Sequence, residues 1–185
     1  HESKYSKTTF HTSLGRPPAA AASTYLHTVK KLSPPDPVVL IDESDVVKPD
    51  GKHFEALVIV GMVQKAPDKN VYKKGYHVTE ACVLTAHKHP VSIFSRLHSS
   101  AEKDYKSVNT ITFDAIRQAV SLFGKATFVM DRGYDDNKIF LFLDQQKQDY
   151  ALRLIAGGIR ASNKCPESFY HTESRSDQRE SKLLL

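Results

Sequence analysis

Short apolar runs separated by polar stretches occupy residues 38 to 155, and their spacing predicts strands before helices. Residues 38–42, 56–63 and 76–85 are apolar or rich in β-branched side chains, which is typical of strands. Residues 91–97 alternate apolar and polar side chains, which favours a further strand or a sheet edge. The polar residues 64–74 predict a hairpin-like connection between the second and third strands.

Helical spacing begins after residue 108. One apolar stripe of an amphipathic helix is formed by residues at i, i+3, i+7 and i+10, namely Phe113, Ile116, Val120 and Phe123. Asn109 or Thr110 is placed to cap this helix, and Gly124 is placed to end it. A strand at 126–131, a helix from about 137 to 146 and a strand at 149–155 follow.

The order of these elements is three or four strands, helix, strand, helix, strand. This order predicts an α/β fold of the RNase H-like kind, a mixed sheet with flanking helices, incomplete at its C-terminus. We expect residues 1–37 to be an N-terminal arm, possessing one short helix from residue 19, or the remnant of a preceding domain. Residues 38–157 would form a partial catalytic core. The polar residues 158–185 predict a disordered tail that does not pack on the core.

Composition adds a leaning toward polyanionic partners. The 185 residues carry a net charge of +5 and a pI of about 9.1. Cys82 and Cys165 form neither a CxxC pair nor a disulfide framework, so a reducing, cytoplasmic compartment is expected. No apolar run approaches the length of a membrane span, and no signal peptide is visible. Because the chain begins with His1, we expect a fragment or a processed product.

Two acids stand at the ends of apolar strands. Asp42 ends the run 38–41, and Asp131 follows the run 127–130 directly. In the predicted fold their strands are neighbours at the centre of the sheet, so the carboxylates would repel each other, and a hard cation such as Mg²⁺ relieves that repulsion. A two-metal site of this type activates a water and stabilises the leaving oxygen of a phosphodiester. The alternative is that Asp131 only begins a turn and that Asp42 only ends a strand.

The segments around these acids resemble DDE transposases of the insertion-sequence-four group. Residues 41–45 (Ile-Asp-Glu-Ser-Asp) are similar to the first-aspartate segment, and residues 131–135 (Asp-Arg-Gly-Tyr-Asp) to the second-aspartate motif. The resemblance covers about residues 38–155. It implies Mg²⁺ or Mn²⁺, strand cleavage and transfer at transposon ends, DNA terminal repeats as partner, and a homodimer in the intact family. It also implies that Asp42 and Asp131 are catalytic, metal-binding acids, in a nucleoid-associated protein if the source is bacterial.

The third acid of the family motif is not recognisable. That family places it in a Tyr-x2-Arg-x3-Glu-x6-Lys signature beyond a long, mostly β insertion. Glu167, Glu173 and Glu180 lack the required neighbours, since Glu173 rather than Arg stands three residues after Tyr170. A truncated or frame-shifted transposase is therefore expected, with weak metal binding and slight activity or none.

Other residues offer weaker functional readings. Arg132, Tyr134 and Arg153 are candidates for DNA contacts, as are lysines such as Lys73 and Lys74, although charged residues of this kind are usually plain solvated surface. The group of Cys82, His87 and His89 fits no standard zinc spacing. Two rivals stay open: another nuclease of the same fold, and an inactive remnant that binds only DNA or an intact transposase subunit.

Overall fold

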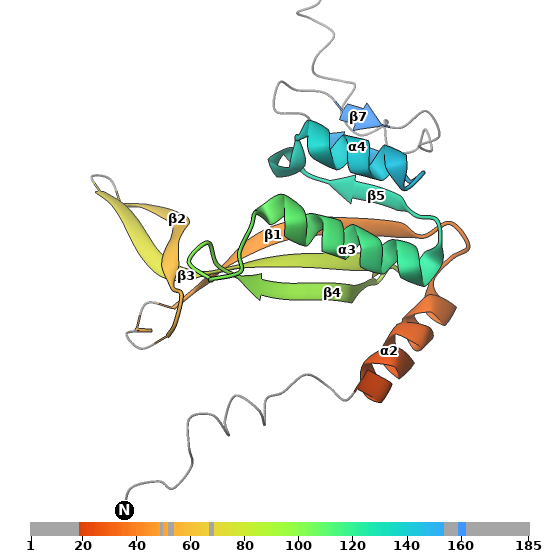
Figure 1. Cartoon of the computed structure of the whole chain (residues 1–185), viewed down its shortest axis with the longest axis horizontal. Helices are drawn as coiled ribbons and strands as arrows, with labels where there is room; N and C mark the ends of the chain where they lie inside the picture. The colour runs from red at the N-terminus through yellow and green to blue at the C-terminus, as the bar shows by residue number, and fades with distance from the viewer. Residues whose placement is uncertain (1–18, 49, 52–53, 67–68, 154–158, 162–185) are drawn as a thin grey trace, which may run out of the picture.

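A single mixed sheet with helices packed on it forms the body of the protein (Figure 1). The structure, a computed structural model, describes residues 19–48, 50–51, 54–66, 69–153 and 159–161. Seven strands are described: β1 (Val38–Val47), β2 (Val58–Ala66), β3 (Lys69–Leu84), β4 (Pro90–His98), β5 (Thr127–Met130), β6 (Asp149–Arg153) and β7 (Ile159–Ala161). The described helices are α2 (Ala19–Leu32), α3 (Val108–Phe123), α4 (Asn137–Gln145) and the short 3-10 helix η1 (Arg132–Tyr134).

The strand order confirms the predicted RNase H-like sheet. The strands follow the order β2-β3-β1-β5-β6-β7, with β4 pairing to β3. β1 pairs antiparallel with β3 and parallel with β5, and β5 pairs parallel with β6. β1 is thus the central strand, with the antiparallel strands on one side and the parallel strands β5 and β6 on the other. The predicted element order requires this arrangement.

The core lies between the sheet and its helices. Along β1, Val39 and Ile41 are buried, whereas Asp42 on the opposite side is exposed. Ile116 on α3 and Phe140 on α4 are buried in the same apolar cluster as the strand residues, and Val29 of α2 joins them. Each helix packs its apolar stripe against the sheet, and this packing explains the helical spacing of apolar residues in the sequence. None of the helices in the described ranges has the length and apolar character needed to cross a bilayer.

Several element ends differ from the prediction. The first strand was predicted to end at residue 42, but β1 continues to Val47, so Asp42 lies within the strand. The polar residues 64–74 are not a connection, because β2 extends to Ala66 and β3 begins at Lys69. The cap of α3 is Ser107, whose Oγ accepts a hydrogen bond from the Thr110 backbone N–H at 3.3 Å, and not Asn109 or Thr110. Gly124 ends α3 as predicted, with φ of 79°. The predicted tail lies outside the described residues, apart from the three residues of β7.

Gly75 allows three strands to meet at one point. It pairs with Val47 of β1 and with Val58 of β2. A Cβ at this position would overlap the Val46 carbonyl oxygen and would lie 2.8 Å from Val60 Cγ2. Since only glycine lacks this atom, the close backbone approach explains the residue choice. Beyond Gly75, β2 and β3 continue as a two-stranded hairpin that projects from the body (Figure 1).

Candidate functional site

Asp42 and Asp131 lie at neighbouring positions of adjacent strands. β1 and β5 run parallel, and their last paired residues are Ile41 and Met130. Asp42 is the next residue of β1, and Asp131 directly follows β5. The predicted pairing of these two strands is therefore confirmed, and it brings both acids to the carboxyl end of the parallel pair, where open α/β sheets usually bind ligands.

A pocket of about 220 Å³ opens at this edge of the sheet. Its lining residues come from β1, from the start of α3 and from the turn after β5: Asp42, Glu43, Val108, Asp131, Gly133 and Tyr134. Three of these side chains carry carboxyl groups, two of which follow the strands singled out in the sequence. A larger pocket of about 550 Å³ between α2 and β4 has no charged lining residue and lies away from these acids.

Both aspartates are held by local backbone donors. Oδ1 of Asp42 accepts a hydrogen bond from the Glu43 N–H at 2.9 Å, and Oδ1 of Asp131 accepts one from the Gly133 N–H at 2.8 Å. Asp131 thereby caps η1. Each Oδ2 has no hydrogen-bond partner among the residues that the structure describes. One oxygen of each acid thus fixes the side chain, while the second stays available to a ligand.

Tyr134 closes the inner side of the pocket. It is 4% exposed, and its hydroxyl oxygen is buried without a hydrogen-bond partner among the described residues. Burial raises the pKa of Tyr134 well above its ordinary value, and the nearby carboxylates of Glu43, Asp42 and Asp131 raise it further. The hydroxyl therefore stays neutral, buried close to the carboxylates of the pocket.

Glu43 links the pocket to two stacked histidines that the sequence did not reveal, the buried His98 and the half-buried His77. Its Oε2 lies 3.6 Å from Nε2 of the fully buried His98. The same Nε2 lies 2.9 Å from Thr79 Oγ1. Its Oε1 lies 3.7 Å from Nδ1 of His77, and that nitrogen is 2.8 Å from Asp45 Oδ1. Burial raises the pKa of Glu43, an effect that the charge of His77 opposes.

Of the other predicted site residues, Tyr134 lines the pocket, and Arg132 lies two positions before it on η1. Arg132 is exposed on η1, whereas the Tyr134 ring is packed in the core. Arg153 is the last residue of β6 and pairs with Ile159, and its side chain lies outside the described part. Glu167, Glu173 and Glu180 also lie outside it. Across the described ranges, no group of three or more His, Cys, Asp or Glu side chains is arranged to hold a metal ion.

Comparison with known proteins gives a matching family and a distant structural likeness. The family model described as "Transposase DDE domain" matches residues 33–182. No curated protein matches the chain in sequence. Among solved structures, the chain is similar to piggyBac transposase in a synaptic complex with hairpin DNA, with 13% identity and a TM-score of 0.43 over 92% of this chain. The match covers 34% of that transposase chain, so this chain spans about a third of its length. Because the family model covers most of the sequence, the chain belongs to the transposase DDE domain family.

Proposed function

We propose that the chain supplies the first two metal-binding acids of a transposase catalytic site, for DNA strand cleavage and transfer at transposon ends. The observation that carries this proposal is the shared pocket of Asp42 and Asp131, each with one oxygen fixed and one available. Family membership supports the same assignment.

The charge of the pocket argues for a divalent cation. Asp42, Glu43 and Asp131 give the pocket lining an acidic character, which repels the phosphate of a DNA backbone. Carboxylate oxygens are the ligands that Mg²⁺ and Mn²⁺ prefer, so the residues present fit such an ion as part of its ligand set. When bound, the metal would neutralise the acids and polarise the phosphoryl oxygens.

The remaining lining residues suit the binding of a phosphate group. Val108 is the first residue of α3, so the positive end of the dipole of that helix faces the pocket. The N–H of Gly133 holds Asp131 in place, and the buried Tyr134 hydroxyl supplies a neutral donor at the pocket wall. Arg132, exposed on η1 beside these groups, is placed to contact the DNA backbone. The proposal further includes terminal-repeat DNA as partner, a homodimer in the intact protein and a cytoplasmic, nucleoid-associated location.

Metal-linked stability tests the proposal. A ligand that binds only the folded chain stabilises it by RT ln(1 + [L]/Kd), about 1.4 kcal/mol at a concentration roughly ten times Kd. We expect Mn²⁺ to raise the urea midpoint of the unmodified chain and to have no such effect on Asp42→Asn or Asp131→Asn. The matched control is Asp144→Asn, since Asp144 is exposed on α4 outside the pocket. An equal metal response in all four proteins would contradict the proposed site.

A further inference from the structure

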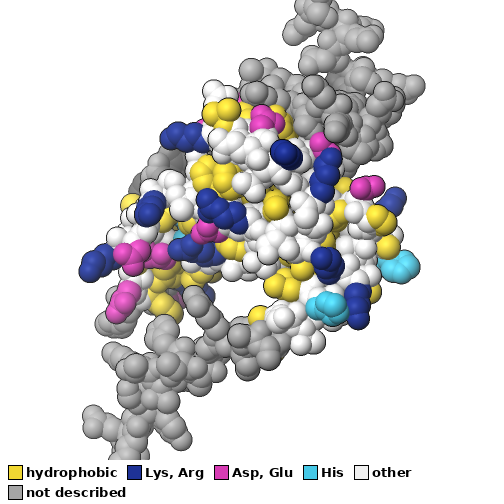
Figure 2. Space-filling model, turned by 45° about the vertical axis from the view of Figure 1, so that its right-hand side comes forward, with side chains coloured by type: hydrophobic (Ala, Val, Ile, Leu, Met, Phe, Trp, Pro, Cys, Tyr) yellow, Lys and Arg dark blue, Asp and Glu magenta, His cyan; other side chains and the backbone are white. Residues whose placement is uncertain are grey.

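Residues 48–76 are one of two basic stretches of the chain, and none of them lines the pocket; the other stretch, residues 1–32, carries a net charge of +4. Residues 48–76 comprise the turn after β1, β2 and the first half of β3. They hold six lysines (Lys48, Lys52, Lys65, Lys69, Lys73 and Lys74) and three acids (Asp50, Glu55 and Asp68). This stretch therefore carries a net charge of +3, more than half of the +5 of the whole chain. Over the face shown in Figure 2, by contrast, basic and acidic side chains are interspersed.

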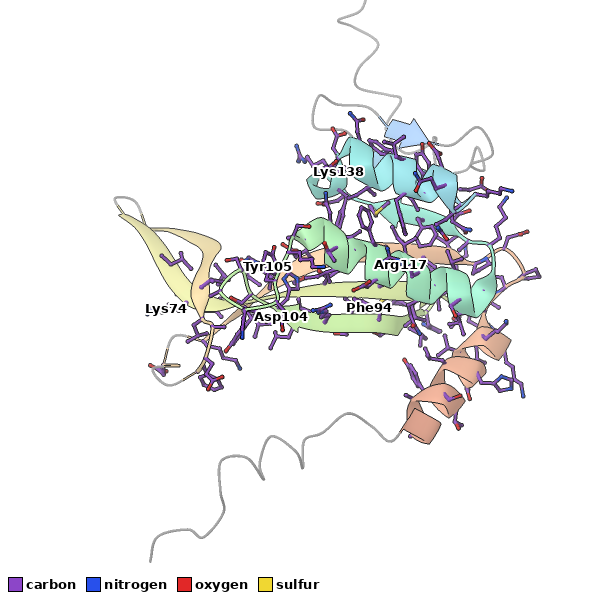
Figure 3. The ribbon with its side chains drawn as sticks, in the orientation of Figure 1. Lys74, Phe94, Asp104, Tyr105, Arg117 and Lys138 are labelled. Carbon is purple, nitrogen blue, oxygen red and sulfur yellow. The ribbon has the colours of Figure 1, made fainter. Side chains whose placement is uncertain are left out.

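The β2–β3 hairpin leaves the sheet at the edge where the pocket lies. β1 carries Asp42 opposite Glu80 of β3 and continues to Val47, which pairs with Gly75. The hairpin extends from this carboxyl end of β1 and away from the helices (Figure 1). Figure 3 labels Lys74 at the base of the hairpin. Lys74 stands six residues along β3 from Glu80, which corresponds to about 20 Å at roughly 3.4 Å per residue.

The lysines at the hairpin base have no acidic partner in the part of the chain that the structure describes. Lys48 and Lys74 are exposed, Lys73 is half-buried, and none forms an ion pair with a described residue. The Lys48 backbone N–H donates to the Lys74 carbonyl oxygen at 2.8 Å, so the two residues are held side by side. Lys125, in contrast, is paired with Asp149 at 2.9 Å. Unpaired ammonium groups gathered on one projecting element attract a polyanion.

We propose that the base of the β2–β3 hairpin, through Lys73 and Lys74, binds the phosphate backbone of duplex DNA that flanks the reacting bond. This inference rests on the proposed function, since it places the reacting phosphate at the pocket. A separation of about 20 Å corresponds to roughly six base pairs at about 3.4 Å each. The hairpin therefore contacts flanking duplex, while the acidic pocket receives the reacting phosphate with its cation. Such contacts set position and affinity without reading sequence.

The test is the salt dependence of DNA binding by the full chain. The probe is a fluorescein-labelled duplex of mixed sequence and about 30 base pairs, titrated by anisotropy at several salt concentrations without divalent metal. The variant is Lys73→Gln/Lys74→Gln. The matched control is Lys30→Gln/Lys31→Gln, which removes the same charge from two exposed residues at the end of α2, ahead of the amino end of β1. Urea midpoints of both variants check that the fold is kept.

The two outcomes are well separated. Each lost phosphate contact makes the slope of log K against log salt shallower by about 0.9, so the hairpin variant should lose about 1.8 of that slope. With binding extrapolated to 1 M salt unchanged, this corresponds to binding roughly 60-fold weaker at about 0.1 M salt. The control should keep the parental slope. Equal slopes for the two variants would overturn the role of the hairpin and leave the pocket proposal standing. Failure of the unmodified chain to bind the duplex would overturn the hairpin inference as well. The pocket is tested separately, by the effect of Mn²⁺ on the urea midpoints of the unmodified chain and of Asp131→Asn.

Discussion

Glu43 contacts the buried His98 beside the pocket. Glu43 Oε2 lies 3.6 Å from His98 Nε2; His98 is fully buried, whereas Glu43 is half-buried. Burial raises the pKa of Glu43 and lowers the pKa of His98, so both effects favour the neutral forms. The charges of His77 and Arg96 lower the pKa of His98 further. The surroundings of His98 consequently favour its uncharged imidazole.

This arrangement predicts a loss of stability on mild acidification. The unfolded chain binds a proton at His98 near its ordinary pKa of 6.5, whereas the folded chain resists that proton. The contribution of His98 to stability is therefore present above about pH 6.5 and is lost as the pH falls toward the folded pKa, by at most about 1.4 kcal/mol per pH unit. Urea midpoints between about pH 7.5 and 5.5 should fall less in His98→Gln than in the unmodified chain. Equal pH slopes in these two proteins would refute the assignment, with the exposed His87→Gln variant as control.

The sequence predicts the aspartates at this scale but not their neighbours. Asp42 and Asp131 are visible because each directly follows an apolar run, a local pattern. The pairing of His77 with Asp45 and with His98 depends on the register of β1, β3 and β4, which no local pattern encodes. A bulge also shifts the register of β3 and β4, because Ala81 pairs with Phe94 but Cys82 pairs with Ser92.

At the scale of elements, the starts of α3 and α4 are joined by a side-chain hydrogen bond. Asn109 Nδ2 donates to Asp136 Oδ2 at 2.7 Å, while Asp136 Oδ1 accepts from the Lys138 N–H at 2.7 Å as the cap of α4. The Lys138 N–H, followed by the Asn109 amide, lowers the pKa of Asp136. One carboxylate thus caps one helix and fixes the first turn of the other, beside the pocket residue Val108.

A double-mutant cycle measures this link between helices. We expect Asp136→Ala to lower the free energy of unfolding by about 1–2 kcal/mol through the lost cap, and Asn109→Ala to lower it by about 1 kcal/mol. Because the two residues share one bond, the double variant should lose less than the sum, with a coupling of at least about 0.5 kcal/mol. Additive losses would show that the hydrogen bond does not stabilise the protein.

The elements differ in how well a local pattern predicts them. α3 was predicted well because four apolar residues keep a helical period, and its stop at Gly124 requires a positive φ. The hairpin formed by β2 and β3 was shortened in the prediction because its lysines, asparagine and glutamine resemble a loop. A two-stranded ribbon that projects from the body has no core face to bury, so its strands do not need alternating apolar residues. Its polar composition reflects exposure to solvent and does not reveal that the backbone is extended.

At the scale of the whole molecule, the structure separates a basic hairpin from an acidic pocket along one edge of the sheet. β1 passes through both, since it carries Asp42 in its middle and contacts Gly75 at its end. Continuous pairing of β1 with β3 from Val39 to Val47 makes this strand a rigid support, which fixes the spacing between the two regions. The described residues place the carboxylates of Asp42, Glu43 and Asp131 around the pocket, yet they contain no group of three such side chains able to hold a metal.

The last prediction concerns catalysis by the chain alone. In-line phosphoryl transfer needs two metals held in fixed positions, and misplacement of reacting groups by about 1 Å is able to lower the rate about 100-fold. With only Asp42 and Asp131 as assigned ligands, the purified chain should show no strand transfer and at most trace nicking of terminal-repeat DNA with Mn²⁺. Asp131→Ala serves as the negative control. Robust cleavage by the unmodified chain that disappears in Asp131→Ala would mean that another acid completes the site, and Glu167→Gln, Glu173→Gln and Glu180→Gln would then identify whether it lies in residues 158–185.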